Sequence, residues 1–173
     1  MNPASAIKTL YQLTYRTIDM NTEGMSHDDS IRQPSPGGNC ANWILGHLTD
    51  VQNEVLKLLE EEPAWDSESL ERTESPITTA DEAIDWDAMR RAFLASEPRC
   101  LAAIDGLPAE KLDEPGYPHP LGGEVTFGEL LNFRAFHQVY QAGQIGLARR
   151  FAGLDGVLGS PAERAEAEAR AAT

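Results

Sequence analysis

Apolar residues recur at steps of three and four positions in four separate segments of the chain, and this spacing restricts its fold more than any other feature. A period near 3.6 residues places apolar side chains along one face of a helix, whereas a half-buried strand needs strict alternation. The chain has no internal repeat and no alternating run longer than a few positions. The pattern therefore predicts an all-α protein, and four amphipathic helices favour a four-helix bundle.

We expect the four helices at about residues 4–20, 40–61, 85–104 and 126–152. The segments between them are long and rich in Gly, Pro, Ser, Asn and Asp, which indicates long crossover loops instead of tight turns. Residues 1–159 are expected to form a single bundle domain. Residues 160–173, which are rich in Ala, Glu and Arg, are expected to form a short C-terminal tail helix.

Several residues predict where the helices begin or break. Asn39 and Asp85 are placed to cap the second and third helices, because their side chains accept hydrogen bonds from free backbone N–H groups. Thr126 and Glu129 have the spacing of a capping box at the start of the fourth helix. Pro98 falls inside the third helix and is expected to bend or break it, since proline lacks a backbone donor.

The charge and the cysteine content restrict the partners and the compartment. Acidic residues outnumber basic ones 28 to 14, giving a formal net charge of −14. A field of that sign repels phosphate backbones and anionic lipids, so we expect neither nucleic acid nor membrane as a partner. The two cysteines, Cys40 and Cys100, form no Cys-x-x-Cys pair, and no apolar run resembles a leader or a membrane span. These features predict a cytoplasmic protein.

Two helices direct polar residues into the expected core. At 100° per residue, His47 shares a face with the apolar residues of the second helix, and His137 and Gln141 share a stripe of the fourth helix. A single histidine on an apolar face is usually an ordinary core residue. Two histidines and a glutamine from two helices instead predict one interior polar cluster. Residues four apart on a helix can also bind one metal ion from the same side.

Two segments carry a resemblance to a known family: NWILGHL around His47 and FHQVYQAGQIGLARRFAG around His137. The chain resembles the DinB/YfiT-like superfamily of bacterial four-helix-bundle metalloproteins. The second segment is similar to the family signature His-x-x-x-His-x-Gly-Gln-Ile, which here begins at His137 and has Gln141 at the position of the second histidine of that signature. The resemblance implies a three-histidine site for a divalent metal, zinc or nickel, usually in a homodimer. Some members use the metal to activate a low-molecular-weight thiol for transfer or isomerisation.

Gln141 is a departure from the family pattern at one metal ligand. An amide oxygen binds a borderline metal more weakly than an imidazole does, so the predicted ligand set of His47, His137 and Gln141 should have a lower affinity. Asp50 and Glu54 are the nearest carboxylates by helical phase. Either one would complete a two-histidine, one-carboxylate set suited to Fe(II) or zinc. The alternative interpretation is that both are solvated or salt-bridged helix residues.

Two functional hypotheses follow from this cluster. In the first, the protein is a metal-dependent enzyme, a thiol-dependent transferase or isomerase, acting on an unidentified small molecule through a degenerate site. In the second, it is a non-catalytic bundle, a binding or stress-response protein that has lost its metal, with Gln141 hydrogen-bonded to a histidine. The sequence identifies no general base for the first hypothesis.

Small residues on the fourth helix add to the expectation of a homodimer. Gly143 and Gly146 lower helix stability, so they indicate close approach by a neighbouring helix or by a partner subunit. Four aromatic residues are expected in the core because of their spacing. They are Trp43, Trp86, Phe133 and Tyr140. His119 lies between two prolines in a loop, where it is placed to border a pocket.

Overall fold

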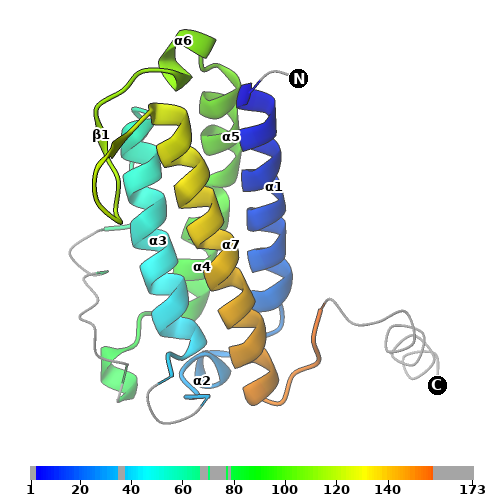
Figure 1. Ribbon diagram of the computed structural model, residues 1–173. Coiled ribbons are helices and arrows are strands. Elements are labelled where there is room, and N and C mark those ends of the chain that lie inside the picture. Colours follow the sequence, from blue (N-terminus) through cyan, green and yellow to red (C-terminus); the bar gives the residue numbers. More distant parts are fainter. Residues whose placement is uncertain (1–2, 35–37, 67–69, 71–76, 78, 158–173) are drawn as a thin grey trace, which may run out of the picture.

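The computed structural model describes residues 3–34, 38–66, 70, 77 and 79–157, which are mostly helical (Figure 1). The elements are α1 (Pro3–Thr22), α2 (His27–Ser30), α3 (Ala41–Leu58), the 3-10 helix η2 (Ala80–Glu82), α4 (Trp86–Ala95), α5 (Glu97–Asp105), α6 (Ala109–Leu112), β1 (Tyr117–Pro118), β2 (Glu124–Val125) and α7 (Phe127–Phe151). The predicted all-α fold is confirmed. The predicted tail helix at 160–173 lies outside the described residues.

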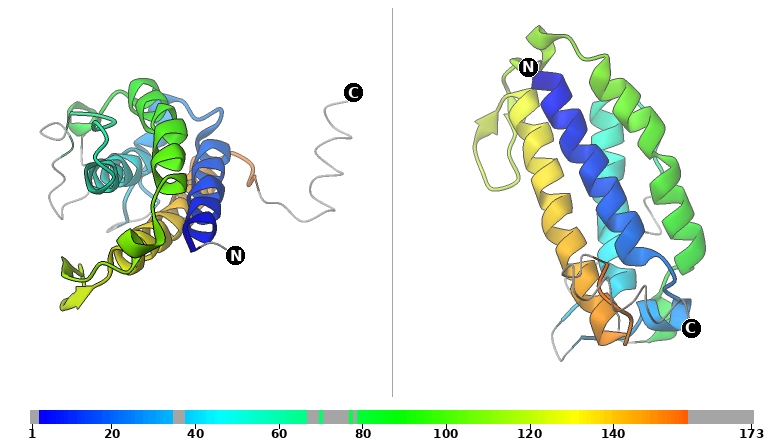
Figure 2. Two further views of the ribbon diagram at one scale, coloured as in Figure 1. Left: turned by 90° about the horizontal axis from the view of Figure 1, so that it is seen from above. Right: turned by 90° about the vertical axis from the view of Figure 1, so that its right-hand side faces the viewer.

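Four rods form the bundle: α1, α3, α7, and the pair α4 and α5, which follow one another (Figure 2). α1 packs mainly against α7 and α5, and α3 packs mainly against α7 and α4. Large side chains fill the space between the rods. Those fully enclosed include Tyr11, Tyr15, Trp86, Phe93 and Phe127. Burial of such aromatic side chains is the main source of the stability of a bundle of this size.

The directions of the rods explain the long connections. α3 and the α4–α5 rod run in the same direction, so the chain between them must return along the length of the bundle (Figure 1). α1 and α7 are also parallel, because contacts follow the same order along both helices: Tyr11 donates a side-chain hydrogen bond to the Leu131 carbonyl, and Asn21, further along α1, donates one to the Ala142 carbonyl. Parallel neighbours in a bundle require crossovers, as the turn-rich segments predicted.

The helix starts agree with the predicted caps at two of three places. The Asp85 carboxylate accepts a hydrogen bond from the Ala88 N–H at 2.7 Å. Thr126 and Glu129 form the predicted capping box, each side chain accepting from the other's backbone N–H. Asn39 was predicted wrongly, because Cys40 occupies the N-cap of α3 and makes no side-chain capping bond.

The proline break is confirmed and lies at Ser96, between α4 and α5, so that Pro98 falls in the first turn of α5, where its missing N–H costs least. Tyr15 of α1 and Ser96 share a hydrogen bond of 2.7 Å at this break. α3 ends at Leu58, earlier than predicted, and Glu60 follows with a positive φ of 60°. Within the described residues, no helix combines the length and hydropathy needed to cross a bilayer.

Candidate metal site

Two imidazoles face each other between α3 and α7. The Nε2 atoms of His47 and His137 lie 3.4 Å apart, and the two rings meet almost at right angles, with centroids 5.1 Å apart. Both side chains are half-buried. The structure therefore brings together the two histidines that helical phase placed in one interior cluster.

Gln141 lies one helical turn beyond His137 and joins the same cluster. Its amide nitrogen is 3.4 Å from His137 Nε2, and its Oε1 atom is buried with no hydrogen-bond partner among the described residues. The nitrogen and oxygen of a glutamine amide have nearly the same shape, so a half-turn of the amide exchanges them. In that orientation an oxygen lone pair, instead of an N–H, faces the two imidazoles.

The separation of the two Nε2 atoms fits a shared metal ion better than a direct hydrogen bond. Zinc–nitrogen bonds of about 2.0–2.1 Å at a tetrahedral angle place the two nitrogens about 3.4 Å apart. A hydrogen bond from nitrogen is normally about 2.7–3.2 Å long. The observed 3.4 Å therefore matches the edge of a tetrahedral site. The residues present fit a divalent ion held by two imidazoles and one amide oxygen.

The surroundings keep both imidazoles neutral, which is the form that binds a metal. Burial lowers the pKa of His47, and the positive charge of Arg134 lowers it further, while Asp50 and Glu54 act in the opposite direction. Burial also lowers the pKa of His137, with smaller contributions from His47 and Arg134. Neither histidine needs to lose a proton near neutral pH before it can act as a ligand.

The support around the ligands is incomplete on one side. The Trp43 ring stacks on His47, with centroids 5.4 Å apart and planes inclined by 27°, and so restricts the orientation of that imidazole. His137 Nδ1 is buried with no hydrogen-bond partner among the described residues. Metal-bound histidines usually donate this second N–H to a carboxylate or carbonyl, which orients the ring and raises its basicity. The unpartnered His137 Nδ1 and the glutamine ligand both predict a modest affinity for a metal ion.

Of the two carboxylates considered as additional ligands, Glu54 is engaged by another residue. Glu54 forms an ion pair of 2.6 Å with Arg134 of α7, so the salt-bridged interpretation is correct for this residue. Among the described residues, no group of three or more His, Cys, Asp or Glu side chains is arranged to hold a metal ion. Asp50 is close enough to His47 to raise the pKa of that histidine, in opposition to burial. Arg134, which lies one turn before His137, was not identified from the sequence.

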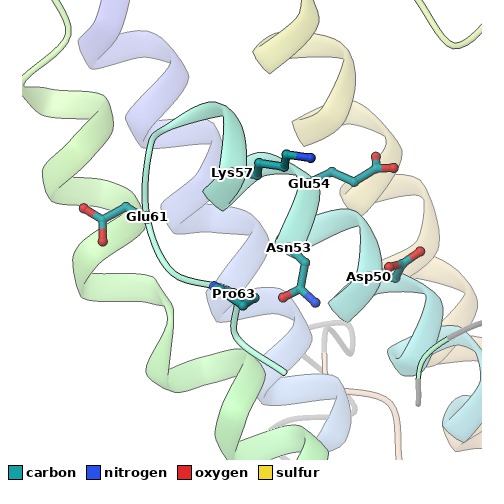
Figure 3. Close-up of a pocket in the computed structure, with 6 residues that line it drawn as sticks. All are labelled: Asp50, Asn53, Glu54, Lys57, Glu61 and Pro63. Atoms are coloured by element: carbon teal, nitrogen blue, oxygen red, sulfur yellow. The ribbon is translucent and has the colours of Figure 1, made fainter. Parts of the chain in front are cut away.

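Asp50 and Glu54 also border a pocket along the C-terminal half of α3. Its volume is about 340 Å³, and its lining residues are Asp50, Asn53, Glu54, Lys57, Glu61 and Pro63. Figure 3 shows Asp50 and Glu54 extending from α3 on the side of α7, whereas Glu61 lies on the side of the α4–α5 rod. His119 packs against α7 about one turn before His137, because its ring lies edge-on against Phe133 with centroids 4.4 Å apart.

A second polar pair joins the same two helices and was also not identified from the sequence. Gln138 of α7 donates a hydrogen bond of 2.8 Å to Gln52 of α3, and both side chains are completely buried. Gln52 Nε2 and Gln138 Oε1 have no hydrogen-bond partner among the described residues. The sequence contains little indication of this pair, because Gln138 directly follows His137 and lies on a different side of the helix from His137 and Gln141.

The family model of the DinB superfamily matches residues 10–145, which extend from α1 through most of α7. The chain belongs to the DinB superfamily. The match includes all three members of the histidine cluster, so the resemblance noted in the sequence is confirmed at the level of the family.

A crystal structure of a conserved protein from Enterococcus faecalis is similar to this DinB-superfamily chain in fold. The TM-score is 0.66 at 17% sequence identity, over 88% of this chain and 98% of that chain. At this identity the likeness concerns the fold alone. A comparison with curated proteins found no match.

Proposed function

We propose that this DinB-superfamily protein binds one divalent metal ion between α3 and α7 and acts as a metal-dependent enzyme on a small molecule. The observation that carries the proposal is the 3.4 Å separation of two Nε2 atoms that face each other. The lowered pKa values of both histidines support it, because neutral imidazoles are metal ligands. Zinc and nickel are the expected ions, and Fe(II) is the next candidate, because imidazole suits all three.

His47 Nε2, His137 Nε2 and the Gln141 amide oxygen would hold the ion. Three protein ligands leave a coordination position open, which is the property that separates catalytic zinc sites from structural ones. When bound, the ion would supply Lewis acidity and lower the pKa of a water or a low-molecular-weight thiol at that position. The half-buried imidazoles leave the position accessible to a small molecule.

Arg134 and Trp43 would contribute the remaining features of the site. The Arg134 charge lowers the pKa of both histidines, so it is close enough to both rings to attract a thiolate or another small anion bound between them. Glu54 holds this guanidinium in position through their ion pair. Trp43 stacks on His47 and restricts access to that ring. This arrangement is compatible with thiol-dependent transfer or isomerisation.

One observation favours a non-catalytic alternative. The Gln141 amide nitrogen lies 3.4 Å from His137 Nε2, and in this orientation it donates a long, weak hydrogen bond to the imidazole instead of offering an oxygen. A protein that had lost its metal would keep this contact as a structural bond. The alternative is a helical-bundle binding or stress-response protein.

Metal titration separates these two functions. Tag-free, metal-depleted protein is titrated with zinc or nickel in a calorimeter, and the bound metal is counted after dialysis. We expect one ion per chain, with affinity at least about tenfold weaker in His47→Ala and in His137→Ala, because a first-shell ligand contributes strongly to a divalent site. His27→Ala is the matched control, since His27 is exposed on α2. A wild-type protein that takes up no metal supports the non-catalytic alternative.

The thiol is tested with cobalt(II) as a spectroscopic probe. Adding a low-molecular-weight thiol to the cobalt-loaded protein should produce a thiolate-to-cobalt charge-transfer band, and Arg134→Gln should require a higher thiol concentration for the same band. A spectrum that does not respond to the thiol would exclude thiol activation while leaving the metal site intact.

A further inference from the structure

The interior hydrogen bond between Gln52 and Gln138 lies next to the histidine cluster. α3 and α7, which carry these two residues, pack side by side (Figure 1). Gln138 directly follows His137 on α7, and Gln52 is five positions after His47 on α3, about 7.5 Å along the axis at 1.5 Å per residue. Gln138 Nε2 donates to Gln52 Oε1 at 2.8 Å. The same two helices thus carry both this hydrogen bond and the proposed metal site.

Stability does not explain the glutamine pair. Both side chains are completely buried, and Gln52 Nε2 and Gln138 Oε1 have no hydrogen-bond partner among the described residues. One hydrogen bond offsets only part of the cost of removing two amides from water. Replacing both members of such a pair by apolar side chains of similar shape can be nearly neutral or stabilising. A role other than stability is therefore indicated.

A hydrogen bond restricts the relative position of two helices more narrowly than apolar contacts do. Its donor and acceptor must stay within about 2.7–3.2 Å of each other and close to a line with the hydrogen. Apolar side chains can repack with small changes in position. A single buried polar side chain selects the register of some coiled coils for this reason, at a cost in stability. The bond between Gln52 and Gln138 can define the rotation of α7 against α3 in the same way.

Gln52 is in turn placed by polar groups of the other two rods. Burial raises the pKa of the Cys100 thiol of α5, whereas the side chains of Gln52 and Tyr15 lower it, so both lie beside the thiol. Tyr15 of α1 shares a hydrogen bond of 2.7 Å with Ser96, which donates one of 2.6 Å to the Phe93 carbonyl. The Cys100, Tyr15 and Ser96 side chains are buried. This line of buried polar groups gives Gln52 a defined place in the core, against which α7 can be positioned.

Small rotations of α7 are large on the scale of the metal site. A helix with its side chains has a radius of about 5–6 Å, so a rotation of about 10° moves an atom at its surface by about 1 Å. A functional site needs its groups held within about 0.5 Å. His137 Nδ1 has no hydrogen-bond partner among the described residues, so the position of this ring depends on that of the helix. Because His137 and Gln138 are consecutive, a rotation that breaks the glutamine bond also displaces the imidazole from His47.

We propose that Gln52 and Gln138 are positioning residues of the metal site. Their hydrogen bond fixes the rotation of α7 against α3, and it thereby holds the Nε2 atoms of His47 and His137 at the separation of 3.4 Å that suits a shared ion. Neither glutamine contacts the ion. The effect on metal binding rests on the proposed function, whereas the arrangement of the two imidazoles can be measured in metal-free protein.

Zinc titration of the double variant Gln52→Met/Gln138→Met tests the effect on metal binding. Methionine has a similar length but makes no directional bond and is flexible. We expect a denaturation midpoint close to that of wild type, zinc affinity at least about tenfold weaker, and an altered visible spectrum of the cobalt(II)-loaded protein. Leu56→Met/Leu131→Met, at completely buried leucines of the same two helices, is the matched control and should bind zinc like wild type. Wild-type zinc affinity in the Gln52→Met/Gln138→Met variant overturns the proposal.

Nuclear magnetic resonance of metal-free protein with isotope-labelled histidine tests the positioning role separately from the metal. Wild type should give one sharp set of side-chain signals for His47 and His137, whereas the methionine variant should give shifted or exchange-broadened signals, because its rings no longer keep one arrangement. If wild type binds no zinc, the proposed function fails, and these spectra decide the positioning role. Identical signals in both proteins overturn it.

A second double variant, Gln52→Leu/Gln138→Leu, carries the same expectations and guards against an effect specific to methionine. Circular dichroism shows whether each variant is folded. Failure of both double variants to fold also overturns the proposal, because the glutamine pair would then be needed for the fold itself.

Discussion

α3 and α7 meet through two polar pairs that differ in almost every physical respect. The Gln52–Gln138 pair is completely buried and forms a hydrogen bond of 2.8 Å. The His47–His137 pair is half-buried, and its facing nitrogens are 3.4 Å apart. The comparison shows that a polar residue on the inner face of a helix is not by itself a functional residue. A closed pair can only hold the helices together, whereas a pair open to solvent can bind something between its members.

The closed pair, Gln52 and Gln138, is also the pair at which a substitution should destabilise the fold more. Gln52 Nε2 and Gln138 Oε1 have no partners among the described residues, so one hydrogen bond offsets only part of the cost of burying two amides. Removing one amide leaves the other without the hydrogen bond that joins the pair. The open pair can replace lost interactions with water.

Gln138→Ala should therefore produce the largest loss of stability. We expect the free energy of unfolding to fall by about 2–4 kcal/mol, because the substitution leaves a cavity and an unpaired Gln52 amide. His137→Ala should cost less than about 1 kcal/mol in metal-free protein, since that side chain is half-exposed. Urea denaturation in the presence of a chelator measures both values. Equal losses would show that the two pairs are not energetically different.

The double variant Gln52→Met/Gln138→Met refines this expectation. Replacing both partners by apolar side chains of similar length removes the two unpaired amide atoms, so stability should return to within about 1 kcal/mol of wild type. A double variant as unstable as Gln138→Ala would mean that the loss of stability comes mainly from the missing hydrogen bond and not from the unpaired amide atom.

Two glycines of α7 show a similar contrast, because Gly146 packs against a buried side chain and Gly143 faces open space. A Cβ atom at Gly146 would lie 3.2 Å from Nδ2 of the buried Asn21 side chain, which is hydrogen-bonded to the Ala142 carbonyl. Gly146→Ala should thus cost about 1–2 kcal/mol. Gly143→Ala should instead stabilise the chain by about 0.5–1 kcal/mol, because the added methyl group meets nothing. Thermal unfolding of the two single variants compares these effects.

Of the two polar pairs, only the His47–His137 pair should contribute a pH dependence to the stability. The pKa values of His47 and His137 are lowered in the folded protein, mainly by burial, so near pH 6 the unfolded chain binds more protons than the folded one. The stability is therefore complete above the unfolded pKa of about 6.5 and falls as the pH drops toward the folded values. The double variant His47→Gln/His137→Gln should flatten this slope in metal-free protein. Gln52→Met/Gln138→Met should not change it.

The sequence predicted the helices and the histidine cluster because both depend on helical phase alone. The caps at Asp85 and Thr126 and the break near Pro98 are local chemistry, and they were also predictable. Tyr140 was placed in the core wrongly, because phase shows which residues share a face but not which face meets a neighbouring helix.

Other features depended on contacts between distant segments. Glu54 was a candidate metal ligand by helical phase, but it forms an ion pair with Arg134, which lies 80 positions further along the chain. The Gln52–Gln138 bond likewise joins two helices whose relative rotation the sequence does not define. The short helices α2 and α6 and the small hairpin lie in segments where no apolar period marks an element.

The affinity of Gln141→His for zinc tests the central claim most directly. If His47 and His137 form a metal site, the substitution supplies a third imidazole one turn from His137, and the affinity should rise at least about tenfold, or about 1.4 kcal/mol. Adding His47→Ala should remove the gain, and Gln12→His, on the exposed face of α1, should give none. Zinc binding no tighter than that of wild type would contradict the account, because the pocket would then serve another purpose and the non-catalytic function would be favoured.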